Sequence, residues 1–386
     1  MEQFKELNRR DFVRTIFMGS VASLVPWRFA GQSKKDNARK DEVNVQYRTL
    51  GRTGLKVSVV GFGAMRTSDP NVIHHALNKG VNYIDTARSY MDGNNEIIVG
   101  NVLKTRRKET YIATKLRPSS EDEMMTSVAT SLKCLQTDVI DVILLHSLVS
   151  RAGVFNEEAM NALDKMRKKG MVRFVGFSTH KNQVECLEAS IEAKFYDVIL
   201  VSYNFKSDPA IGEAITKVAQ AGIGVVGMKT QAGGYTDPGL EGWSPHQAAL
   251  RWVLQNPGMA TTIPSMVTIA QVDENVKVMG KRFGAHDQEI LERYGELYDR
   301  VLCRTCGTCE KQCQFGVPIQ DINRSLMYAE GYRDYDLALR TYRELFTEAP
   351  LQACLQCENC TVTCKYGLDI PARLARAREI FGTVMA

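Results

Sequence analysis

Short apolar runs alternate with longer amphipathic stretches through the middle of the sequence, and this alternation restricts the fold more than any other feature. The apolar runs are rich in Val and Ile, and the stretches between them, such as residues 156–170, have helical periodicity. The eight predicted strands cover residues 57–63, 82–87, 110–115, 139–146, 172–178, 197–204, 223–229 and 260–265. Eight strand–helix units in about 225 residues predict an α/β chain built on a (β/α)8 TIM barrel.

A doubly wound open sheet is the alternative fold for such an alternation. That fold usually carries a glycine-rich phosphate-binding turn, G-x-G-x-x-G, after its first strand. The corresponding segment here, GFGAM at residues 61–65, lacks this spacing. The barrel is therefore the expected fold.

Polar residues stand at the ends of three consecutive predicted strands. Asp85 and Tyr90 come at and after the end of the second strand, Lys115 ends the third, and His146 ends the fourth. Because the chemistry of a TIM barrel takes place at the carboxyl ends of its strands, we expect these four side chains to converge on one face. The less specific interpretation is a buried charge network that only braces the barrel.

The four residue types suit proton transfer. A free phenol has a pKa of about 10, which is too high for efficient proton exchange near neutrality. Lys115 beside Tyr90 would favour the phenolate and lower that pKa, and Asp85 would hold the lysine in place. Tyr90 would then be able to exchange a proton near neutrality.

Eight of the ten cysteines form two runs with identical spacing. The runs begin at Cys303 and Cys354, and each reads C-x2-C-x2-C-x3-C, the spacing that holds a [4Fe–4S] cluster. Zinc is the alternative, but a zinc site pairs two C-x2-C knuckles and has no use for the remaining cysteines. The two cysteines outside the runs, Cys134 and Cys186, lie on apolar helical faces and are expected to be inert core thiols.

In two-cluster ferredoxins the fourth cysteine of each run ligates the other cluster. The two predicted ligand sets are Cys303, Cys306, Cys309 and Cys364, and Cys354, Cys357, Cys360 and Cys313. Much of the segment between the runs reads as helix. Residues 286–386 are therefore predicted to be a small, mainly helical, ferredoxin-like iron–sulfur domain that follows a barrel at residues 46–285.

The segment NRRDFVR, residues 8–14, resembles a twin-arginine export signal because two arginines precede a short, moderately apolar stretch. A chance Arg-Arg pair in an N-terminal arm is the alternative. Iron–sulfur clusters are assembled where thiols stay reduced, and the twin-arginine route carries folded cargo, so the two features explain each other. Residues 1–30 are predicted to be the signal segment, residues 31–45 a linker, and the protein periplasmic or otherwise exported by this machinery.

Composition excludes some other functions. The net charge of +5 is small, and no basic stripe with interleaved aromatic residues is present, so a nucleic-acid partner is not expected. No apolar run approaches the roughly 20 residues of a membrane-spanning helix.

The barrel region resembles the aldo/keto reductase superfamily. The segment GVNYIDTARSYMDGNNEIIVG matches the family signature around Asp85 and Tyr90, IATK carries the family's lysine as Lys115, and ILLH carries its histidine as His146. The resemblance covers roughly residues 46–285, and one subgroup of the family also carries a C-terminal ferredoxin-like tail. It implies a TIM barrel that interconverts a carbonyl and an alcohol. Tyr90 would be the general acid in carbonyl reduction, and His146 would orient the substrate oxygen by hydrogen bonding.

The resemblance also implies a nicotinamide cofactor, NAD(H) or NADP(H). The positions that match the family's cofactor contacts are Ser178, Tyr203, Ser265, Glu274 and Asn275. Two amide-binding positions of the family are changed, to Thr179 and Leu200, and neither Ser265 nor Gln271 supplies the basic group expected for the 2′-phosphate of NADP. Weak NADP binding is therefore expected, because unpaired buried polar groups cost about 1–3 kcal/mol each.

Together these features predict an exported oxidoreductase that interconverts a small carbonyl compound and an alcohol, with a sugar as one candidate. Two [4Fe–4S] clusters would relay electrons to a redox partner protein, or, as the alternative, would be structural and fasten the tail to the barrel. The alternatives are a repurposed barrel that serves as scaffold for an electron-transfer protein, and a cytoplasmic reductase that uses NADH. The loop at residues 230–244 is the expected substrate-facing loop, and its Tyr235 and Trp243 either stack on a sugar ring or are packing residues. His180 is a further candidate for the pocket.

Overall fold

The computed structural model describes residues 44–235, 244–345, 350–357 and 359–382. The predicted export signal, nearly all of the predicted linker and Trp243 lie outside the described residues. In the part of the chain that is described, no helix is both long and apolar enough to cross a membrane.

A sheet of eight parallel strands forms the centre of the molecule, and its strands follow one another in sequence order. They are β3 (Phe62–Gly63), β4 (Tyr83–Asp85), β5 (Tyr111–Leu116), β6 (Ile140–Leu145), β7 (Val172–Thr179), β8 (Val198–Ser202), β9 (Gly224–Met228) and β10 (Met259–Thr262). Backbone hydrogen bonds from Gly61 to the carbonyl of Thr262, 2.7 Å, and from Gly63 to that of Pro264, 3.0 Å, join the two ends of the sheet. The sheet therefore closes, and the predicted TIM barrel is confirmed.

The first predicted strand, residues 57–63, is divided in the structure. Its beginning belongs to β2 (Lys56–Ser58), which pairs with β1 (Tyr47–Thr49) as an antiparallel hairpin, and only its end joins the barrel as β3. The hairpin turn lies so close to β9 that a Cβ atom on Gly51 would be 2.3 Å from the backbone nitrogen of Gly224. Apolar residues of this hairpin pack among those that fill the barrel interior. The apolar run at residues 57–63 thus contributes to two strands, β2 and β3.

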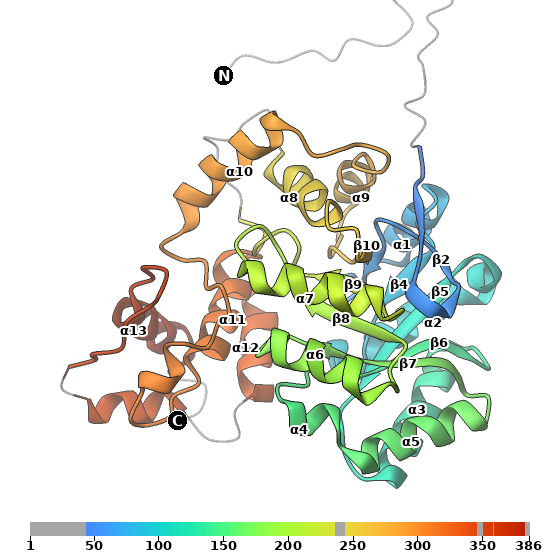
Figure 1. Cartoon of the computed structure of the whole chain (residues 1–386), viewed down its shortest axis with the longest axis horizontal. Helices are drawn as coiled ribbons and strands as arrows, with labels where there is room; N and C mark the ends of the chain where they lie inside the picture. Colours follow the sequence, from blue (N-terminus) through green and yellow to red (C-terminus); the bar gives the residue numbers. More distant parts are fainter. Residues whose placement is uncertain (1–43, 236–243, 346–349, 358, 383–386) are drawn as a thin grey trace, which may run out of the picture. The chain divides into compact units, whose positions relative to one another are not determined.

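Helices cover the outside of the barrel, as Figure 1 shows. They are α1 (Pro70–Asn78), α2 (Asn94–Arg106), α3 (Glu121–Leu135), α4 (Arg151–Val154), α5 (Glu157–Lys168), α6 (Gln183–Ala193), α7 (Pro209–Gln220), α8 (Pro245–Leu254) and α9 (Ile269–Val276). Side chains of Ser120, Asn156 and Asp208 accept backbone hydrogen bonds at the starts of α3, α5 and α7, as helix N-caps do. The next helix, α10 (Ala285–Tyr298), packs on α8 through Ile290 and Leu291.

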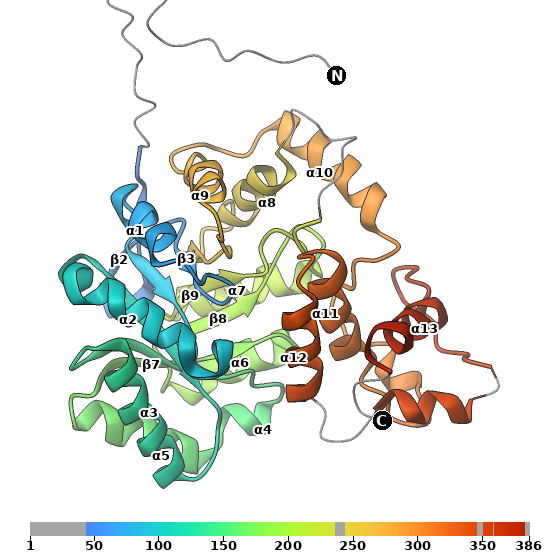
Figure 2. The same ribbon diagram turned by 180° about the vertical axis from the view of Figure 1, so that it is seen from behind.

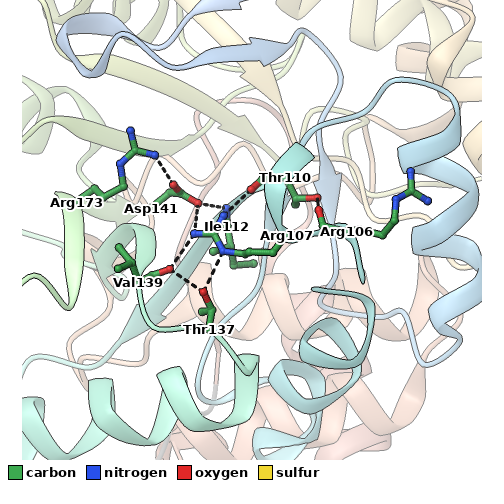
Figure 3. A network of polar contacts seen from close by, with 8 residues as sticks. All are labelled: Arg106, Arg107, Thr110, Ile112, Thr137, Val139, Asp141 and Arg173. Atoms are coloured by element: carbon green, nitrogen blue, oxygen red, sulfur yellow. Dashed lines mark hydrogen bonds and ion pairs between the residues drawn. The ribbon is translucent and has the colours of Figure 1, made fainter. Parts of the chain in front are cut away.

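A buried carboxylate braces the amino-terminal ends of β5, β6 and β7, far along the strands from their carboxyl ends (Figure 3). Asp141 accepts a hydrogen bond from the backbone of Ile112, 2.9 Å, and pairs with Arg107 and Arg173 at 2.9 and 2.6 Å. Arg107 also donates to the carbonyl of Val139, 2.8 Å. A buried carboxylate needs such ion-pair and hydrogen-bond partners, and this network supplies them to Asp141. It lies at the end of the barrel opposite the face where catalysis is expected, so its role is structural.

The region that follows α10 is mainly helical. It contains α11 (Ile319–Glu330), α12 (Tyr335–Leu345) and α13 (Ile370–Phe381), with short 3-10 turns η5 (Glu310–Gln312) and η6 (Pro350–Gln356). Its own apolar core includes Leu326 and a stacked pair, Tyr342 and Phe381, whose ring centroids are 4.6 Å apart. In both whole-chain views α11 and α12 lie between the barrel and α13 (Figure 1, Figure 2).

Polar contacts join this helical region to loops at the carboxyl ends of barrel strands. Arg66, after β3, donates to Asp334 at 3.1 Å, and Lys181, after β7, pairs with Glu310. Gly331 ends α11 where a Cβ atom would be 2.2 Å from the carbonyl oxygen of Gly233, so only glycine permits this approach to the loop after β9. The helical region therefore covers the face of the barrel where the predicted catalytic residues lie.

Candidate active site

A cavity of about 460 Å³ opens at the carboxyl ends of the barrel strands. Residues from the barrel form one part of its wall, among them Asp85, Tyr90 and His146. Residues from α11 and α12, among them Arg324 and Tyr328, form another part. The cavity is thus built by the barrel and the C-terminal region together.

Lys115 and Asp85 form a buried ion pair at the base of this cavity. The Lys115 ammonium donates to a carboxylate oxygen of Asp85 and, at 2.7 Å, to the carbonyl of Thr86. Both charged side chains are almost completely buried. Burial lowers the pKa of Lys115 and raises that of Asp85, and the mutual attraction of the pair opposes both shifts. Pairing therefore keeps a positive charge where water cannot solvate it.

Tyr90 lies between this lysine and His146. The ammonium nitrogen of Lys115 is 4.8 Å from the centroid of the Tyr90 ring. The ring of His146 meets that of Tyr90 edge to face, with centroids 5.9 Å apart. The structure therefore brings together all four residues that were predicted to be catalytic, and their roles remain predictions.

Two histidines line the cavity and both are held neutral. Burial, together with nearby positive charges such as those of Lys115 and Arg324, lowers the pKa of His146 to about 3. Burial and the same cationic surroundings also lower the pKa of His180. A neutral imidazole can donate one hydrogen bond to a substrate oxygen without competing as a proton source.

The C-terminal region supplies cavity residues that the sequence pattern did not indicate. Arg324 and Tyr328 lie on α11, and Tyr332 follows it. Tyr328 and Tyr332 stack with ring centroids 5.4 Å apart, and Lys229, after β9, donates a hydrogen bond to the Tyr328 hydroxyl. These residues lie in the segment between the cysteine runs, which was predicted only to be largely helical, and no local signal placed that helix over the barrel.

Some predicted ligand contacts lie elsewhere. Tyr203 packs against Trp252, with centroids 5.1 Å apart, and a Cβ atom on Gly212 of α7 would lie 2.8 Å from its hydroxyl, so its ring lies in the helix layer. The Ser178 hydroxyl accepts a hydrogen bond from the backbone of Ser147, 2.8 Å. Tyr235, expected to face substrate, is only 6% exposed and stacks on Tyr298.

The two altered amide-binding positions offer no side-chain contact to the cavity. Leu200 is fully buried in the barrel interior, among apolar side chains. Thr179 is also buried, and its hydroxyl donates to the carbonyl of Lys181, 3.0 Å. The structure therefore agrees with the expectation that a nicotinamide amide would have few partners here.

Residues predicted for the other end of a dinucleotide do gather beside the cavity. Ser265 lines it, and so does Gln231, whose amide donates to Asn275 at 2.8 Å. The Glu274 carboxylate accepts a hydrogen bond from Ser244 at 2.5 Å. These contacts connect the segment after β9 to α9 (Ile269–Val276).

The first predicted cysteine set is drawn together from both runs. Burial raises the pKa of the Cys303 thiol to about 12, and the thiols of Cys309, Cys306 and Cys364 raise it too, which places them within electrostatic reach of one another. Reciprocal hydrogen bonds of 3.0 Å between Gln312 and the backbone of Thr363 hold the two runs side by side. Backbone nitrogens of Thr305 and Tyr366 lie 3.4 Å from the sulfurs of Cys303 and Cys364.

The second set lines one cavity of about 540 Å³. Its wall carries all four predicted ligands: Cys313, Cys354, Cys357 and Cys360. All eight cysteines of the runs are free thiols. Among the described residues, no three His, Cys, Asp or Glu side chains are arranged to hold a single metal ion. A cubane cluster holds its four cysteine ligands farther apart than a single metal ion does, so this finding applies to single ions only. Four thiolates are the donor set that a [4Fe–4S] cluster requires, and each predicted set provides them.

Comparison with known proteins defines the class of the barrel. Residues 60–239 match the Aldo/keto reductase family. The aldo-keto reductase AKR11C1 from Bacillus halodurans superposes with a TM-score of 0.56 and 25% identity, over 64% of this chain and 96% of that one. The fold, the matched segment and the related enzymes indicate an oxidoreductase whose barrel is similar to the aldo/keto reductases.

Individual relatives extend the comparison. L-galactose dehydrogenase of Arabidopsis thaliana is 26% identical over 67% of this chain and 95% of that protein. The uncharacterized oxidoreductase YqkF of Bacillus subtilis is 30% identical, over 36% of this chain and only half of that protein. An aldo-keto reductase from Klebsiella pneumoniae in complex with NADPH has the same fold, with a TM-score of 0.55 and 22% identity.

Proposed function

We propose that this chain interconverts a small carbonyl compound and the corresponding alcohol at Tyr90, and that two [4Fe–4S] clusters in its C-terminal region relay electrons to a redox partner protein. The observation that carries the proposal is the convergence of Asp85, Lys115, Tyr90 and His146 at one cavity. The L-galactose dehydrogenase relative makes a sugar or sugar derivative a reasonable substrate class.

In the direction of reduction, the Tyr90 hydroxyl gives its proton to the carbonyl oxygen of the substrate. The ammonium of Lys115, 4.8 Å from the ring centroid, stabilises the phenolate that remains. Asp85 holds that ammonium charged and in position. The neutral His146 donates a hydrogen bond to the same substrate oxygen and orients it for the transfer. Alcohol oxidation uses the same groups in reverse.

A nicotinamide, when bound, supplies or accepts a hydride at the substrate carbon, whereas iron–sulfur clusters exchange single electrons. Ser265, Gln231, Glu274 and Asn275 would hold the phosphate and adenine end of the dinucleotide. Because neither Ser265 nor Gln271 supplies a basic group for the 2′-phosphate of NADP, NAD(H) is the better candidate than NADP(H). An exported enzyme would need to carry such a cofactor out with it.

The cluster proposal is supported by the position of the first cysteine set relative to the active site. Cys303 lines a small cavity of about 30 Å³ together with Lys229 and Arg324. The same two cationic residues line the catalytic cavity. A cluster bound through Cys303 would therefore be separated from the active-site cavity by one layer of side chains.

Replacement of Tyr90 by Phe tests the catalytic part of the proposal. The change keeps the ring and removes the proton donor, and turnover of small carbonyl compounds and alcohols should fall by about 10²–10⁴-fold. Tyr335→Phe, which removes an exposed hydroxyl from the start of α12, is the matched control. Unchanged turnover by the Tyr90 variant would contradict a mechanism in which this phenol is the proton donor.

Export by the twin-arginine route is a separate part of the proposal and rests on residues 8–14. Fractionation of the native host tests it, with the Arg9→Lys/Arg10→Lys variant as comparison. The wild-type protein should be found outside the cytoplasm and the variant inside it. Recovery of both proteins only from the cytoplasm would rule out export.

A further inference from the structure

The cavity that contains Tyr90 has a strongly cationic wall. Four Lys and Arg side chains of the described chain line it: Arg117, Lys229, Arg324 and Arg340. Only two carboxylates of the described residues do, and both have partners: Asp85 pairs with Lys115, and Asp321 accepts from Arg324 at 3.1 Å and lies 4.0 Å from Lys181. Arg340 also lies 3.9 Å from Asp92, which is outside the cavity lining. The cations still outnumber the carboxylates around a space of substrate size.

Buried polar atoms on this wall also lack partners. Within the described part of the chain, no hydrogen-bond partner is present for Arg324 Nε, His180 Nδ1, Thr230 Oγ1 or the second carboxylate oxygen of Asp85. Arg324 is 8% exposed and Thr230 is 1% exposed. Buried polar groups in folded proteins are almost always hydrogen-bonded, so the three atoms outside the Asp85–Lys115 pair indicate groups that a ligand satisfies.

These groups come from three separate elements and act on one another. His180 follows β7, Thr230 and Lys229 follow β9, and Arg324 lies on α11. Arg324 and Lys229 both contribute to the lowered pKa of His180, after burial itself, and to that of His146. The cationic groups are thus within electrostatic reach of the histidine that is predicted to orient the reacting oxygen.

We propose that this wall binds a carboxylate group of the substrate through four residues: His180, Lys229, Thr230 and Arg324. The substrate class is then a small hydroxy acid or oxo acid, acidic sugars included. The assignment rests on the proposed function, because it places the carboxylate in the same cavity as Tyr90. It also gives α11 of the C-terminal region a role in substrate binding.

A carboxylate fits this wall better than a phosphate does. Asp321 engages one terminal nitrogen of Arg324, and Nε is a buried guanidinium donor without a hydrogen-bond partner among the described residues. The Asp321 carboxylate would also repel a dianion more strongly than a monoanion. A singly charged group that accepts a few hydrogen bonds matches both features.

Calorimetric titration of the full-length holoprotein tests the proposal without any need for turnover. The probes are acetate, L-lactate and D-glucuronate, each compared with its own uncharged primary amide, and inorganic phosphate. At least one acid should bind about tenfold or more tightly than its amide, since hydrogen bonds to charged groups are the stronger ones. Arg324→Gln should remove this preference, and Arg324→Lys should restore part of it.

Two controls make the result specific. Arg343→Gln removes the same charge from an exposed position on α12 and should leave the preference unchanged. Tyr90→Phe should also keep it, so that loss of turnover and loss of carboxylate binding are told apart. The proposal is overturned if no acid binds, if amides bind as tightly as acids, if Arg324→Gln keeps the preference, or if phosphate binds more tightly than every acid through Arg324.

Discussion

The ammonium group of Lys229, directly after barrel strand β9, donates a hydrogen bond to the phenol of Tyr328 on α11 and lies 4.5 Å from the centroid of its ring. Tyr328 stacks on Tyr332, and the guanidinium of Arg66 lies 4.8 Å from the Tyr332 ring centroid. The contacts that join the C-terminal region to the barrel are therefore also part of the cavity wall. A cysteine-rich region and a catalytic barrel share one site.

Replacement of Tyr328 by Phe should weaken this junction. The ring remains but the oxygen that accepts from Lys229 is lost, so the free energy of unfolding should fall by about 1–3 kcal/mol in a denaturant titration. Lys229→Met combined with Tyr328→Phe should cost less than the two single changes added together. Full additivity would mean that the hydrogen bond does not couple the two residues. Tyr335→Phe is the control.

Breaking the buried pair of Asp85 and Lys115 should damage both stability and turnover. Asp85→Asn leaves an uncompensated buried charge, and the expected loss is about 3–5 kcal/mol of unfolding free energy. Addition of Lys115→Met removes that charge and should recover much of the stability without any recovery of turnover. A double variant that regains turnover would show that the pair only braces the barrel.

The lowered pKa of His146 predicts a pH dependence of stability. The folded protein keeps this imidazole neutral down to about pH 3, whereas the unfolded chain binds a proton near its ordinary pKa of 6.5. Stability should therefore fall as the pH decreases through this window, by up to about 1.4 kcal/mol per pH unit from this group. Unfolding free energies at pH 7, 6 and 5 should fall less steeply in His146→Gln than in the wild type.

The exposed residue His286 provides the matched control for that experiment. His286→Gln should retain the wild-type slope. Equal slopes for the wild type and His146→Gln would contradict the neutral, buried state of His146. The same state predicts that the turnover rate does not titrate with His146 between pH 5 and pH 8.

The exchange of ligands between the cysteine runs can be tested by counting iron. Cys364→Ser should remove one cluster and leave about four irons per chain, because Cys364 is assigned to the set of Cys303. Adding Cys306→Ser should cost no further iron, whereas adding Cys313→Ser should remove the rest. The combination of Cys364→Ser with Cys360→Ser should likewise remove both clusters. If Cys364 instead ligated the same cluster as Cys360, this double variant would keep about four irons per chain, which would contradict the exchange.

The barrel and its central residues could be predicted from the sequence because both depend on local patterns. The alternation of strands and helices determines the fold, and the carboxyl ends of parallel strands meet at one face, so Asp85, Lys115 and His146 had to lie close together. Tyr90, five residues beyond Asp85, follows in the same loop. Only the first strand was assigned incorrectly, because one apolar run continues from β2 into β3.

The rest of the site depends on tertiary contacts that no local pattern specifies. Arg324 and Tyr328 lie on an amphipathic helix, and the sequence does not say which surface that helix covers. Tyr203 and Tyr235 carry rings that suit ligand stacking, yet both pack against other aromatic side chains. Near a strand end, a shift of one residue reverses the direction in which a side chain points. The residue type alone therefore could not decide whether such a ring faces the cavity or packs against other side chains.

The most direct test of the account is the metal and cofactor content of the protein purified without oxygen. Iron and sulfide are counted, and the denatured protein is searched by mass spectrometry for an organic cofactor. The account predicts about eight irons and eight sulfides per chain, with one nicotinamide dinucleotide. Zinc in place of iron, or a chain that carries a flavin and no nicotinamide dinucleotide, would contradict it.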